Sequence, residues 1–298
     1  MPVWKQLLLS LYYHGTRPLR WWNLRRAVAE RRVPVVVLYY HRVADDRAND
    51  WTISNRLFAR QIRWLQSHFE LISLEEAQRR IRTGENDRPC VSITFDDGYA
   101  DNCREAIPLL IRERIPCTYF VTLQNVLDGK PFSHDLAEGN AFLPNTLEQL
   151  RAMAAAGIEI GAHTRTHAGL ATIADPRRLH DEIVVAGEQL QQAVGRPVRH
   201  FAFPFGQYAH LSREAFAAAE KAGYEAVCSA YGGFNFPGDD PFHLHRIPAD
   251  DVMIRLKNWT TLDPRKLDTP RFDYDVPLVN EDHAPKDNPC SAAATNKA

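Results

Sequence analysis

The chain has 298 residues, of which 45% are hydrophobic and 24% are charged, and its formal net charge is −1. This length can bury a large core, and the near-neutral charge provides no global field for a nucleic-acid partner. No apolar run approaches the ~20 residues that a membrane-spanning helix requires. We therefore expect a globular protein that does not bind nucleic acid.

The five cysteines are widely spaced and include no CxxC pair. An odd number of scattered cysteines is typical of reduced thiols in a reducing compartment. The apolar run at residues 7–13 is not followed by the small residues of a signal-peptide cleavage site. We therefore expect a cytoplasmic protein, associated with the inner membrane face if its N-terminal segment binds lipid.

Residues 1–32 form a basic, tryptophan-rich N-terminal segment. They include seven Lys or Arg residues and one acidic residue, a net charge of +6, together with Trp4, Trp21 and Trp22. This composition suits a helix that lies on an anionic membrane surface and makes a peripheral contact with it. A terminal helix packed on the catalytic domain is the alternative, and the sequence leaves both open.

Residues 33–262 carry alternating strand and helix signals, which indicate an α/β fold with a parallel sheet. Short apolar runs predict strands at residues 33–40, 90–93, 117–122, 158–161, 199–203, 224–229 and 243–247. Apolar spacing and capping residues predict helices that span or begin at residues 54–68, 72–76, 104–114, 146–156, 177–194 and 212–222. About seven such strands are enough to close a barrel whose site lies at the C-terminal ends of the strands.

Two other segments lack this alternation. Residues 124–144 have no clear periodicity and contain several Gly and Pro residues, which predicts a long functional or lid loop. Residues 263–298 are rich in polar residues and Pro and form a predicted C-terminal extension with a disordered end at residues 291–298. The predicted organisation is therefore a single catalytic domain, residues 33–262, between two extensions.

Two adjacent carboxylates, Asp96 and Asp97, stand where the predicted strand at residue 90 ends. Gly98 follows them and permits a turn, which both side chains need if they are to serve one site. One carboxylate can then bind a metal ion while the other stays free. A turn with an acidic cap is the alternative for this segment alone.

Two histidines, His163 and His167, supply the second half of a candidate metal site. Residues four apart on a helical turn face the same way, so both imidazoles can reach one ion. With one carboxylate of Asp96 and Asp97 they form a His2Asp set typical of zinc or a related divalent ion, which lowers the pKa of the water that it binds toward ~7. The other carboxylate can take the proton. An unrelated surface pair is the alternative for the two histidines by themselves.

Three segments together resemble the polysaccharide deacetylases of carbohydrate esterase family 4: residues 94–99 (TFDDGY), 163–167 (HTRTH) and 201–206 (FAFPFG). The resemblance covers residues 33–248. It implies a distorted (β/α) barrel of about seven parallel strands, a divalent metal, and removal of N-acetyl groups from aminosugar polymers. It also implies that Asp96 is the catalytic base and that Asp97, His163 and His167 are the metal ligands.

The third segment departs from the family pattern at Ala202, where many members have an arginine that orients the base. The segment is closer to a subgroup with an Ala-aromatic-Pro-aromatic-Gly version of this motif. By resemblance, the backbone N–H of Phe205 helps to stabilise the oxyanion. An aromatic wall around the barrel mouth is the alternative role for these side chains.

The family takes its proton donor from the histidine of a Leu-x-His motif near the last strand. In this chain the corresponding letters are His243-Leu244-His245-Arg246, so Arg246 occupies the place of that histidine. The first choice of general acid is His245, and His243 is the second. His41, at the end of the first predicted strand, is a further candidate for the pocket wall, with a buried structural role as its alternative.

The expected function is that of a metal-dependent carbohydrate N-deacetylase acting on an N-acetylated glycan, with zinc or another divalent transition metal as cofactor. Two alternatives remain open. One is a metal-dependent amidase or imidase that uses the same site on a non-sugar C–N bond. The other is a catalytically impaired glycan-binding protein, suggested by the missing arginine and the displaced Leu-x-His histidine.

Overall fold

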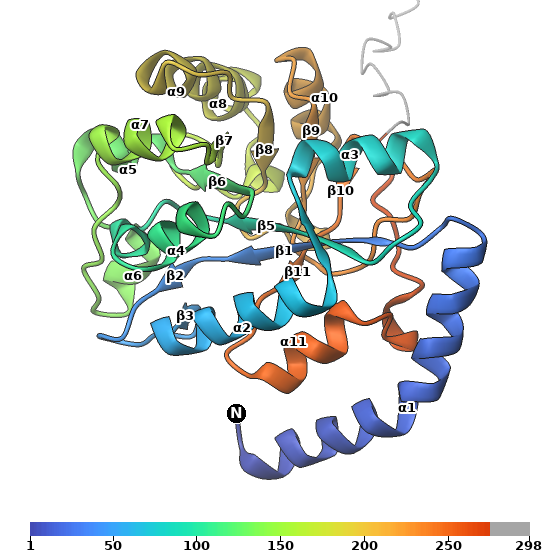
Figure 1. Cartoon of the computed structure of the whole chain (residues 1–298). Helices are drawn as coiled ribbons and strands as arrows, with labels where there is room; N and C mark the ends of the chain where they lie inside the picture. Colours follow the sequence, from blue (N-terminus) through green and yellow to red (C-terminus); the bar gives the residue numbers. More distant parts are fainter. Residues whose placement is uncertain (275–298) are drawn as a thin grey trace, which may run out of the picture.

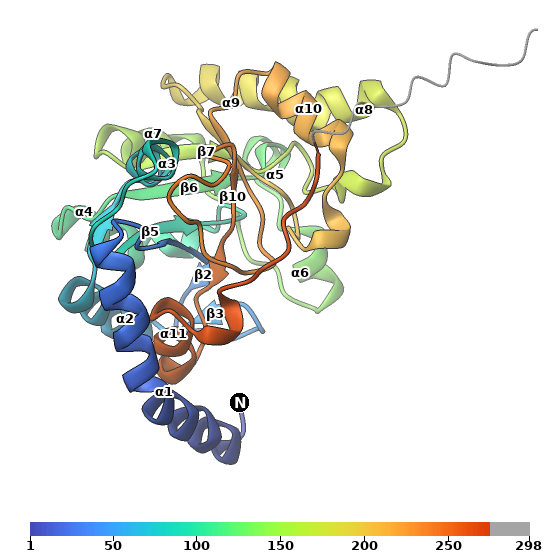
Figure 2. The ribbon, with the colours of Figure 1, turned by 90° about the vertical axis from the view of Figure 1, so that its right-hand side faces the viewer.

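A curled parallel sheet forms the centre of the protein, and helices cover its outer side, as Figures 1 and 2 show. The structure is a computed structural model, and it describes residues 1–274. The predicted disordered end at residues 291–298 therefore lies outside the described residues.

Nine strands make up this sheet, and every pairing in it is parallel. Eight of them follow the order β10-β9-β8-β7-β6-β5-β1-β11, and β4 pairs with β5 beside them. The strands are β1 (Val35–Tyr40), β4 (Glu70–Ile72), β5 (Cys90–Phe95), β6 (Cys117–Val121), β7 (Glu159–Ala162), β8 (His200–Ala202), β9 (Ala226–Cys228), β10 (His243–Leu244) and β11 (Ile247–Pro248). A separate small sheet pairs β2 (Arg42–Val43) with β3 (Thr52–Ile53).

The prediction of an α/β barrel-like fold is confirmed, but the number of strands is larger than the predicted seven. Each predicted strand segment contains a strand. The last one, residues 243–247, holds two: β10 pairs with β9, and β11 pairs with β1. One short segment thus joins the two ends of the curled sheet, with a break at His245 and Arg246. The additional strand, β4, is only three residues long and precedes a predicted helix, so it is too short to give a pattern of its own.

The sheet is buried on both faces, as parallel sheets usually are. All six residues of β1 and all six of β5 are buried. Alternate residues of β1 belong to two clusters: Val36 and Leu38 to the main core, and Val35 and Val37 to a smaller one that also contains residues of α3. The near-continuous apolar runs in the sequence reflect this burial on both sides.

Eleven α-helices are present in the described part of the chain, and Ser73 caps α3 as predicted. Ser54, Thr146 and Ser212, which were predicted as helix starts, also prove to be caps: like Ser73, each accepts a hydrogen bond from a first-turn N–H. The helices are α1 (Val3–Ala29), α2 (Asn55–His68), α3 (Leu74–Thr83), α4 (Ala106–Arg112), α5 (Leu123–Asp128), α6 (Ser133–Ala137), α7 (Leu147–Ala155), α8 (Pro176–His180), α9 (Ala186–Val194), α10 (Arg213–Lys221) and α11 (Met253–Thr260). The predicted helix at 177–194 is observed as α8 and α9 joined by a π-helical turn, Asp181–Val185.

The predicted lid loop at residues 124–144 is wrong in part, because it contains most of α5 and all of α6. These helices have six and five residues, which is too short to show an apolar period. Asp135 of α6 is completely buried. The segment is therefore an ordered wall of the domain.

The N-terminal helix α1 packs along α11 with one face, and it bends in Figure 1, as expected for a helix with Pro18 inside it. The buried guanidinium of Arg20 fixes the two helices together. Its Nη1 donates to the carbonyl oxygens of Asn258 and Thr261, both at 2.9 Å, and its Nη2 donates to the side-chain oxygen of Asn258 at 2.8 Å. These carbonyls at the end of α11 lack helical partners, so Arg20 satisfies them.

Candidate active site

A cavity of about 340 Å³ lies at the C-terminal ends of the strands, where the ligand sites of parallel α/β folds form. Five of the six site residues predicted from the sequence line this cavity. These are Asp96, Asp97, His163, His167 and Phe205. The sixth, His245, is not among the lining residues. Four residues that were not assigned roles from sequence, Tyr39, Trp51, His134 and Glu138, complete much of the wall.

The turn after β5 brings both carboxylates to the cavity. Asp97 has a φ of 72° and Gly98 a φ of 96°, so the chain leaves the strand through the left-handed region. A Cβ on Gly98 would lie 2.9 Å from the Cγ1 of Val121, so only glycine fits against this neighbouring strand. The predicted turn at Gly98 is confirmed, and both Asp96 and Asp97 are buried.

Asp97, His163 and His167 form a group that can hold a metal ion, since their ligand atoms all lie within 4.8 Å of one another. The Oδ1 atom of Asp97 is 3.4 Å from Nε2 of His163 and 3.2 Å from Nε2 of His167. This Oδ1 is buried and accepts no hydrogen bond, which is costly for a carboxylate oxygen without a cation. The donor set therefore fits a divalent ion such as zinc.

The tautomer of His163 also suits a metal ligand. Its Nδ1 lies 2.7 Å from the carbonyl oxygen of Ala202 and donates to it, because a carbonyl can only accept. The lone pair of the neutral ring is then on Nε2, which faces Asp97. Ala202 thus orients a candidate metal ligand through its backbone carbonyl, as the partners of metal-binding histidines commonly do.

The two histidines do not stand on a helical turn, so this part of the sequence reasoning is wrong. Residues 163–167 form an irregular loop after β7. Thr164 and His167 have φ values of 64° and 60°, and the hydroxyl of Thr164 accepts the N–H of His167 at 3.0 Å. The imidazoles converge because the loop turns back on itself, an arrangement that the i,i+4 spacing cannot predict.

Glu182, in the π-helical turn, holds this loop from the outside. Its Oε2 accepts the backbone N–H of Thr166 at 2.9 Å, and its Oε1 accepts the Thr166 hydroxyl at 2.5 Å. π-Helical turns occur frequently at functional sites. Glu182 was not predicted as a functional residue from the sequence. It could have been noticed, because the helical period places this acidic residue on the buried side of its helix, where a carboxylate needs partners.

Arg246 provides the cation beside Asp96. Its Nη1 and Nη2 donate to the two oxygens of Asp96 at 2.6 and 2.8 Å, a bidentate pair with both side chains buried. Its Nε donates to the carbonyl of Ser229 at 3.0 Å, and its Nη1 also reaches the hydroxyl of Thr94. Asp96 is therefore oriented by an arginine from the break between β10 and β11, whereas Ala202 stands at the position where the resemblance led us to expect an arginine.

The two neighbouring carboxylates both keep a low pKa, for different reasons. Burial raises the pKa of Asp96, but the charge of Arg246 outweighs it and holds the pKa below its usual value. Burial also raises the pKa of Asp97, and here the adjacent imidazoles of His163 and His167 lower it well below its usual value. Both acids are therefore carboxylates at neutral pH.

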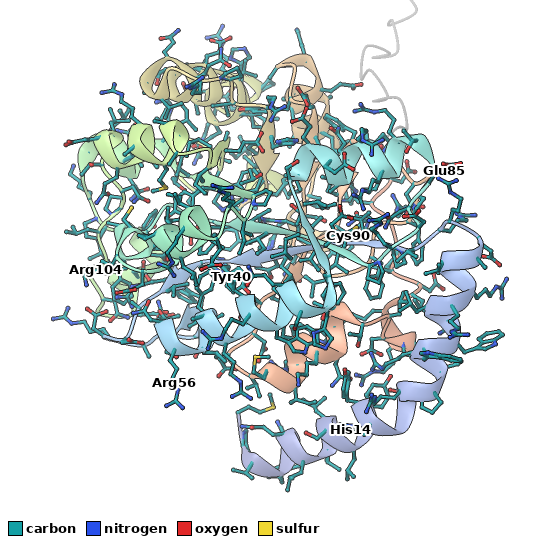
Figure 3. All side chains as sticks on the ribbon, viewed as in Figure 1. His14, Tyr40, Arg56, Glu85, Cys90 and Arg104 are labelled. Carbon is teal, nitrogen blue, oxygen red and sulfur yellow. The ribbon has the colours of Figure 1, made fainter. Side chains whose placement is uncertain are left out.

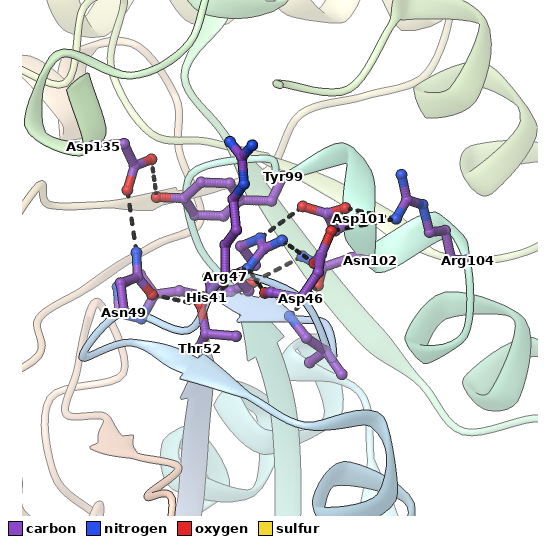
Figure 4. A network of polar contacts seen from close by, with 12 residues as sticks. His41, Asp46, Arg47, Asn49, Thr52, Tyr99, Asp101, Asn102, Arg104 and Asp135 are labelled. Carbon is purple, nitrogen blue, oxygen red and sulfur yellow. Dashed lines mark hydrogen bonds and ion pairs between the residues drawn. The ribbon is translucent and has the colours of Figure 1, made fainter. Parts of the chain in front are cut away.

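His41 lines the cavity at the end of β1, next to the strand that carries Asp96. Asn102 fixes the backbone around it, as Figure 4 shows: Asn102 Nδ2 donates to the His41 carbonyl at 2.8 Å, and its Oδ1 accepts the N–H of Val43 at 2.8 Å. The imidazole itself makes no hydrogen bond within the described residues. Burial lowers the pKa of His41, although Asp97 and Asp96 act in the opposite direction.

A second imidazole in the cavity, His134, belongs to a network centred on Tyr99. The Tyr99 hydroxyl donates to Oδ2 of Asp135 at 2.8 Å and accepts from Nε1 of Trp51 at 3.1 Å, and Nε2 of His134 lies 3.0 Å from it. Figure 4 shows how Asp135 also contacts the loop at Asn49. Burial lowers the pKa of His134 to about 4 and raises that of Asp135 to about 6.

The histidines chosen from the Leu-x-His resemblance lie outside the cavity wall. His243 is buried, and its Nε2 lies 3.0 Å from the hydroxyl of Ser229. His245 is buried as well, with Nδ1 3.1 Å from the carbonyl of Gly232 and Nε2 without a hydrogen-bond partner. Burial lowers the pKa of His245 to about 4.

Phe205 stands at the cavity with a half-exposed ring and a φ of 62°. Its ring packs edge-on against His167 with centroids 4.9 Å apart. Its backbone N–H donates no hydrogen bond within the described residues, so it is available to a ligand. Both predicted roles, an aromatic wall and an amide donor, are compatible with this position.

Comparison with known proteins finds similarity to polysaccharide deacetylases. The family model for polysaccharide deacetylases matches residues 83–227. A protein of Bacillus subtilis (strain 168) named "Putative polysaccharide deacetylase YxkH" is 26% identical over 226 residues, which cover 75% of this chain and 74% of that protein. The chitooligosaccharide deacetylase of Bradyrhizobium sp. (strain ANU 289) is 30% identical over 139 residues, covering 46% of this chain and 54% of that protein.

The fold is similar to that of a solved deacetylase. The structure of Streptococcus pyogenes deacetylase PplD in complex with acetate superposes with a TM-score of 0.65. The match covers 78% of this chain and 99% of that chain at 22% sequence identity. The curled parallel sheet is therefore the fold of this group of deacetylases.

Proposed function

We propose that this chain is a polysaccharide deacetylase, a metal-dependent hydrolase that removes N-acetyl groups from an N-acetylated aminosugar glycan, and its similarity to that family supports the proposal. The observation that carries the proposal is one cavity in which the Asp97, His163 and His167 group stands beside the Asp96–Arg246 pair. The name of the Bradyrhizobium relative supports oligomers of N-acetylglucosamine as the substrate class.

The residues that would hold the metal are Asp97, His163 and His167, and we propose zinc as the ion because the set has two imidazoles and one carboxylate. Such an ion, when bound, lowers the pKa of a water molecule and polarises the acetyl carbonyl. With only three protein ligands, such an ion could also bind the water molecule and the acetyl oxygen. The ring of His163 is held for this task by the Ala202 carbonyl.

Asp96 is proposed as the general base. Its two oxygens are held by the guanidinium of Arg246, which keeps it deprotonated and fixes its direction. It takes a proton from the attacking water. The free N–H of Phe205 is proposed as a donor to the oxyanion of the tetrahedral intermediate, since preorganised amides at such positions stabilise developing charge.

We propose His41, rather than His245, as the group that protonates the departing amine. A general acid must come within hydrogen-bond reach of the atom that it protonates. His41 lines the cavity with both carboxylates, and its imidazole packs against the ring of Tyr39 but makes no hydrogen bond with any described residue. His134 also lines the cavity, but its Nε2 is in contact with Tyr99.

Acetate release from N-acetylglucosamine oligomers and polymers, measured with and without chelator, tests the function. We expect release that stops when the metal is removed. The Asp97→Ala variant should lose bound metal and activity together, whereas Asp96→Asn should keep the metal and stop turnover. Full activity in metal-free Asp97→Ala protein would refute the assignment. Release from non-sugar amides alone would favour an amidase, and glycan binding without any release would favour a glycan-binding protein.

The acid is tested by a pair of variants. His41→Ala should lower kcat by about 10²–10⁴ with little change in bound metal, because general acid catalysis contributes factors of that size. His245→Ala is the matched control, since that ring lies outside the cavity wall. A larger loss of kcat in His245→Ala than in His41→Ala would reverse the choice.

A further inference from the structure

The outward face of α1 is the most apolar surface of the described protein. The described part of the protein has fourteen exposed large hydrophobic side chains, and nine of them lie on α1. Leu8 and Leu11 are 56% and 69% exposed, and Trp4 and Trp22 are 59% and 55% exposed. Contiguous exposed apolar surface of this kind usually marks a place of interaction.

These four side chains lie on a single stripe of the helix. Residues 4, 8, 11 and 22 are separated by four, three and eleven positions, which the helical period of 3.6 places on one side. The opposite side is the one that packs on the domain. There Arg20 binds the end of α11, and the hydroxyl of Tyr12 donates to Asp263 at 2.7 Å. The domain therefore fixes α1 with its apolar stripe turned outward.

Basic side chains accompany this stripe. Residues 1–32 have a net charge of +6. The ammonium of Lys5 lies 5.4 Å from the ring centre of Trp4, and the guanidinium of Arg25 lies 4.1 Å from that of Trp21. Tryptophan and basic residues around an apolar strip are characteristic of helices that lie in the interface of an anionic bilayer. None of the helices among residues 1–274 is long and apolar enough to cross one.

We propose that the outward face of α1 docks on the surface of an anionic lipid bilayer, with Leu8 and Leu11 in the headgroup region and the basic side chains against the phosphates. Charge decides between this partner and a second copy of the chain. A symmetric dimer would place the same basic segment against itself, and like charges oppose such contact. An anionic surface attracts the segment instead, and the cytoplasmic leaflet of a cell membrane is such a surface.

Co-sedimentation of the full-length protein with vesicles tests the proposal. We expect binding to vesicles of phosphatidylcholine with one quarter phosphatidylglycerol, and little binding to phosphatidylcholine alone. The Leu8→Gln/Leu11→Gln variant should partition at least about ten-fold less, because two apolar side chains no longer enter the lipid. The Lys5→Gln/Arg25→Gln variant should bind roughly thirty-fold more weakly to the anionic vesicles.

The matched control is Leu127→Gln/Leu143→Gln, which changes two leucines of 47% and 58% exposure away from α1. It should sediment like the unchanged protein. Equal sedimentation of all four proteins overturns the proposal, and so does equal binding to neutral and anionic vesicles. If the protein ignores vesicles but is a dimer that Leu8→Gln/Leu11→Gln converts to a monomer, the face is a self-association surface and the proposal is wrong.

Discussion

Asp96 and Asp97 are neighbours in the chain, yet the two sides of the cavity give them different partners. On the Asp97 side the partners are two imidazoles, which can be neutral and offer lone pairs to a metal ion. On the Asp96 side the partner is a guanidinium, which is always charged and offers only donors. The comparison shows that Asp97 is suited to bind a cation together with other ligands, and that Asp96 is suited to accept a proton.

A third buried carboxylate, Asp135, has only an uncharged imidazole near it: Nε2 of the cavity residue His134 lies 3.7 Å from its Oδ2, and burial lowers the pKa of His134 to about 4. Asp135 accepts hydrogen bonds from the hydroxyl of Tyr99 and from the amide of Asn49. Burial consequently raises its pKa to about 6, whereas the pKa values of Asp96 and Asp97 are lowered. The charge of the partner, rather than burial, therefore decides how each of these acids titrates.

We expect the largest effect on stability and turnover when the guanidinium of Arg246, the partner of Asp96, is removed. In Arg246→Met, Asp96 becomes a buried charge without a partner, which costs about 3–5 kcal/mol of stability when one member of a buried pair is lost. Turnover should also fall, because burial alone raises the pKa of the base. Urea denaturation and acetate release measure the two effects.

The double variant Asp96→Asn/Arg246→Met is the control for this experiment. It removes both charges, so we expect it to recover part of the lost stability while staying inactive. An Arg246→Met protein that unfolds at the same urea concentration as the unchanged protein would show that the ion pair does not hold Asp96.

On the Asp97 side, Glu182→Ala should have a smaller effect. It removes both acceptors of Thr166 and loosens the loop that presents His163 and His167. Losing a partner of this kind typically costs 10–100-fold in metal affinity. Metal titration by calorimetry measures it, with Glu188→Ala, an exposed residue of the neighbouring α9, as the matched control. Unchanged affinity in Glu182→Ala would mean that the loop is held by other contacts.

The smallest expected effect is a pH dependence at Asp135. Its folded pKa of about 6 is above the value of ~4 in an unfolded chain, so the folded state binds the proton more tightly. The protein should therefore gain stability relative to Asp135→Asn as the pH falls through about 6, and this gain should level off below ~4. Thermal unfolding of both proteins at pH 7.5 and pH 5.0 measures the difference. A difference that is the same at both pH values would contradict the raised pKa.

The sequence was most informative where a signal is local. Apolar runs at residues 33–40 and 90–93 predicted the strands β1 and β5, and Ser73 and Thr146 predicted helix starts, because burial and capping depend on a few consecutive residues. Asp97, His163 and His167 were found from motif resemblance, and the structure brings their ligand atoms together. The reason offered for the two histidines, a helical turn, was wrong, because a loop of positive φ values brings them together.

The partners of these residues could not be predicted in the same way. The contact between Arg246 and Asp96 spans 150 positions, and it exists only because residues 243–248 join the two ends of the sheet. His134 and Asp135 come from a segment that was expected to be a loop. Contacts of this kind depend on the path of the whole sheet, which no single segment encodes.

The amino-acid sequence by itself thus determined the parallel α/β core, the turn at Gly98 and the residue types of the metal group, because each follows from short-range pattern or from motif. Only the tertiary structure decided which cation holds Asp96, which imidazoles face the cavity, and which side of α1 remains exposed. The physical reason is that charge pairing and burial act between atoms close in space, and folding alone sets which distant residues become neighbours.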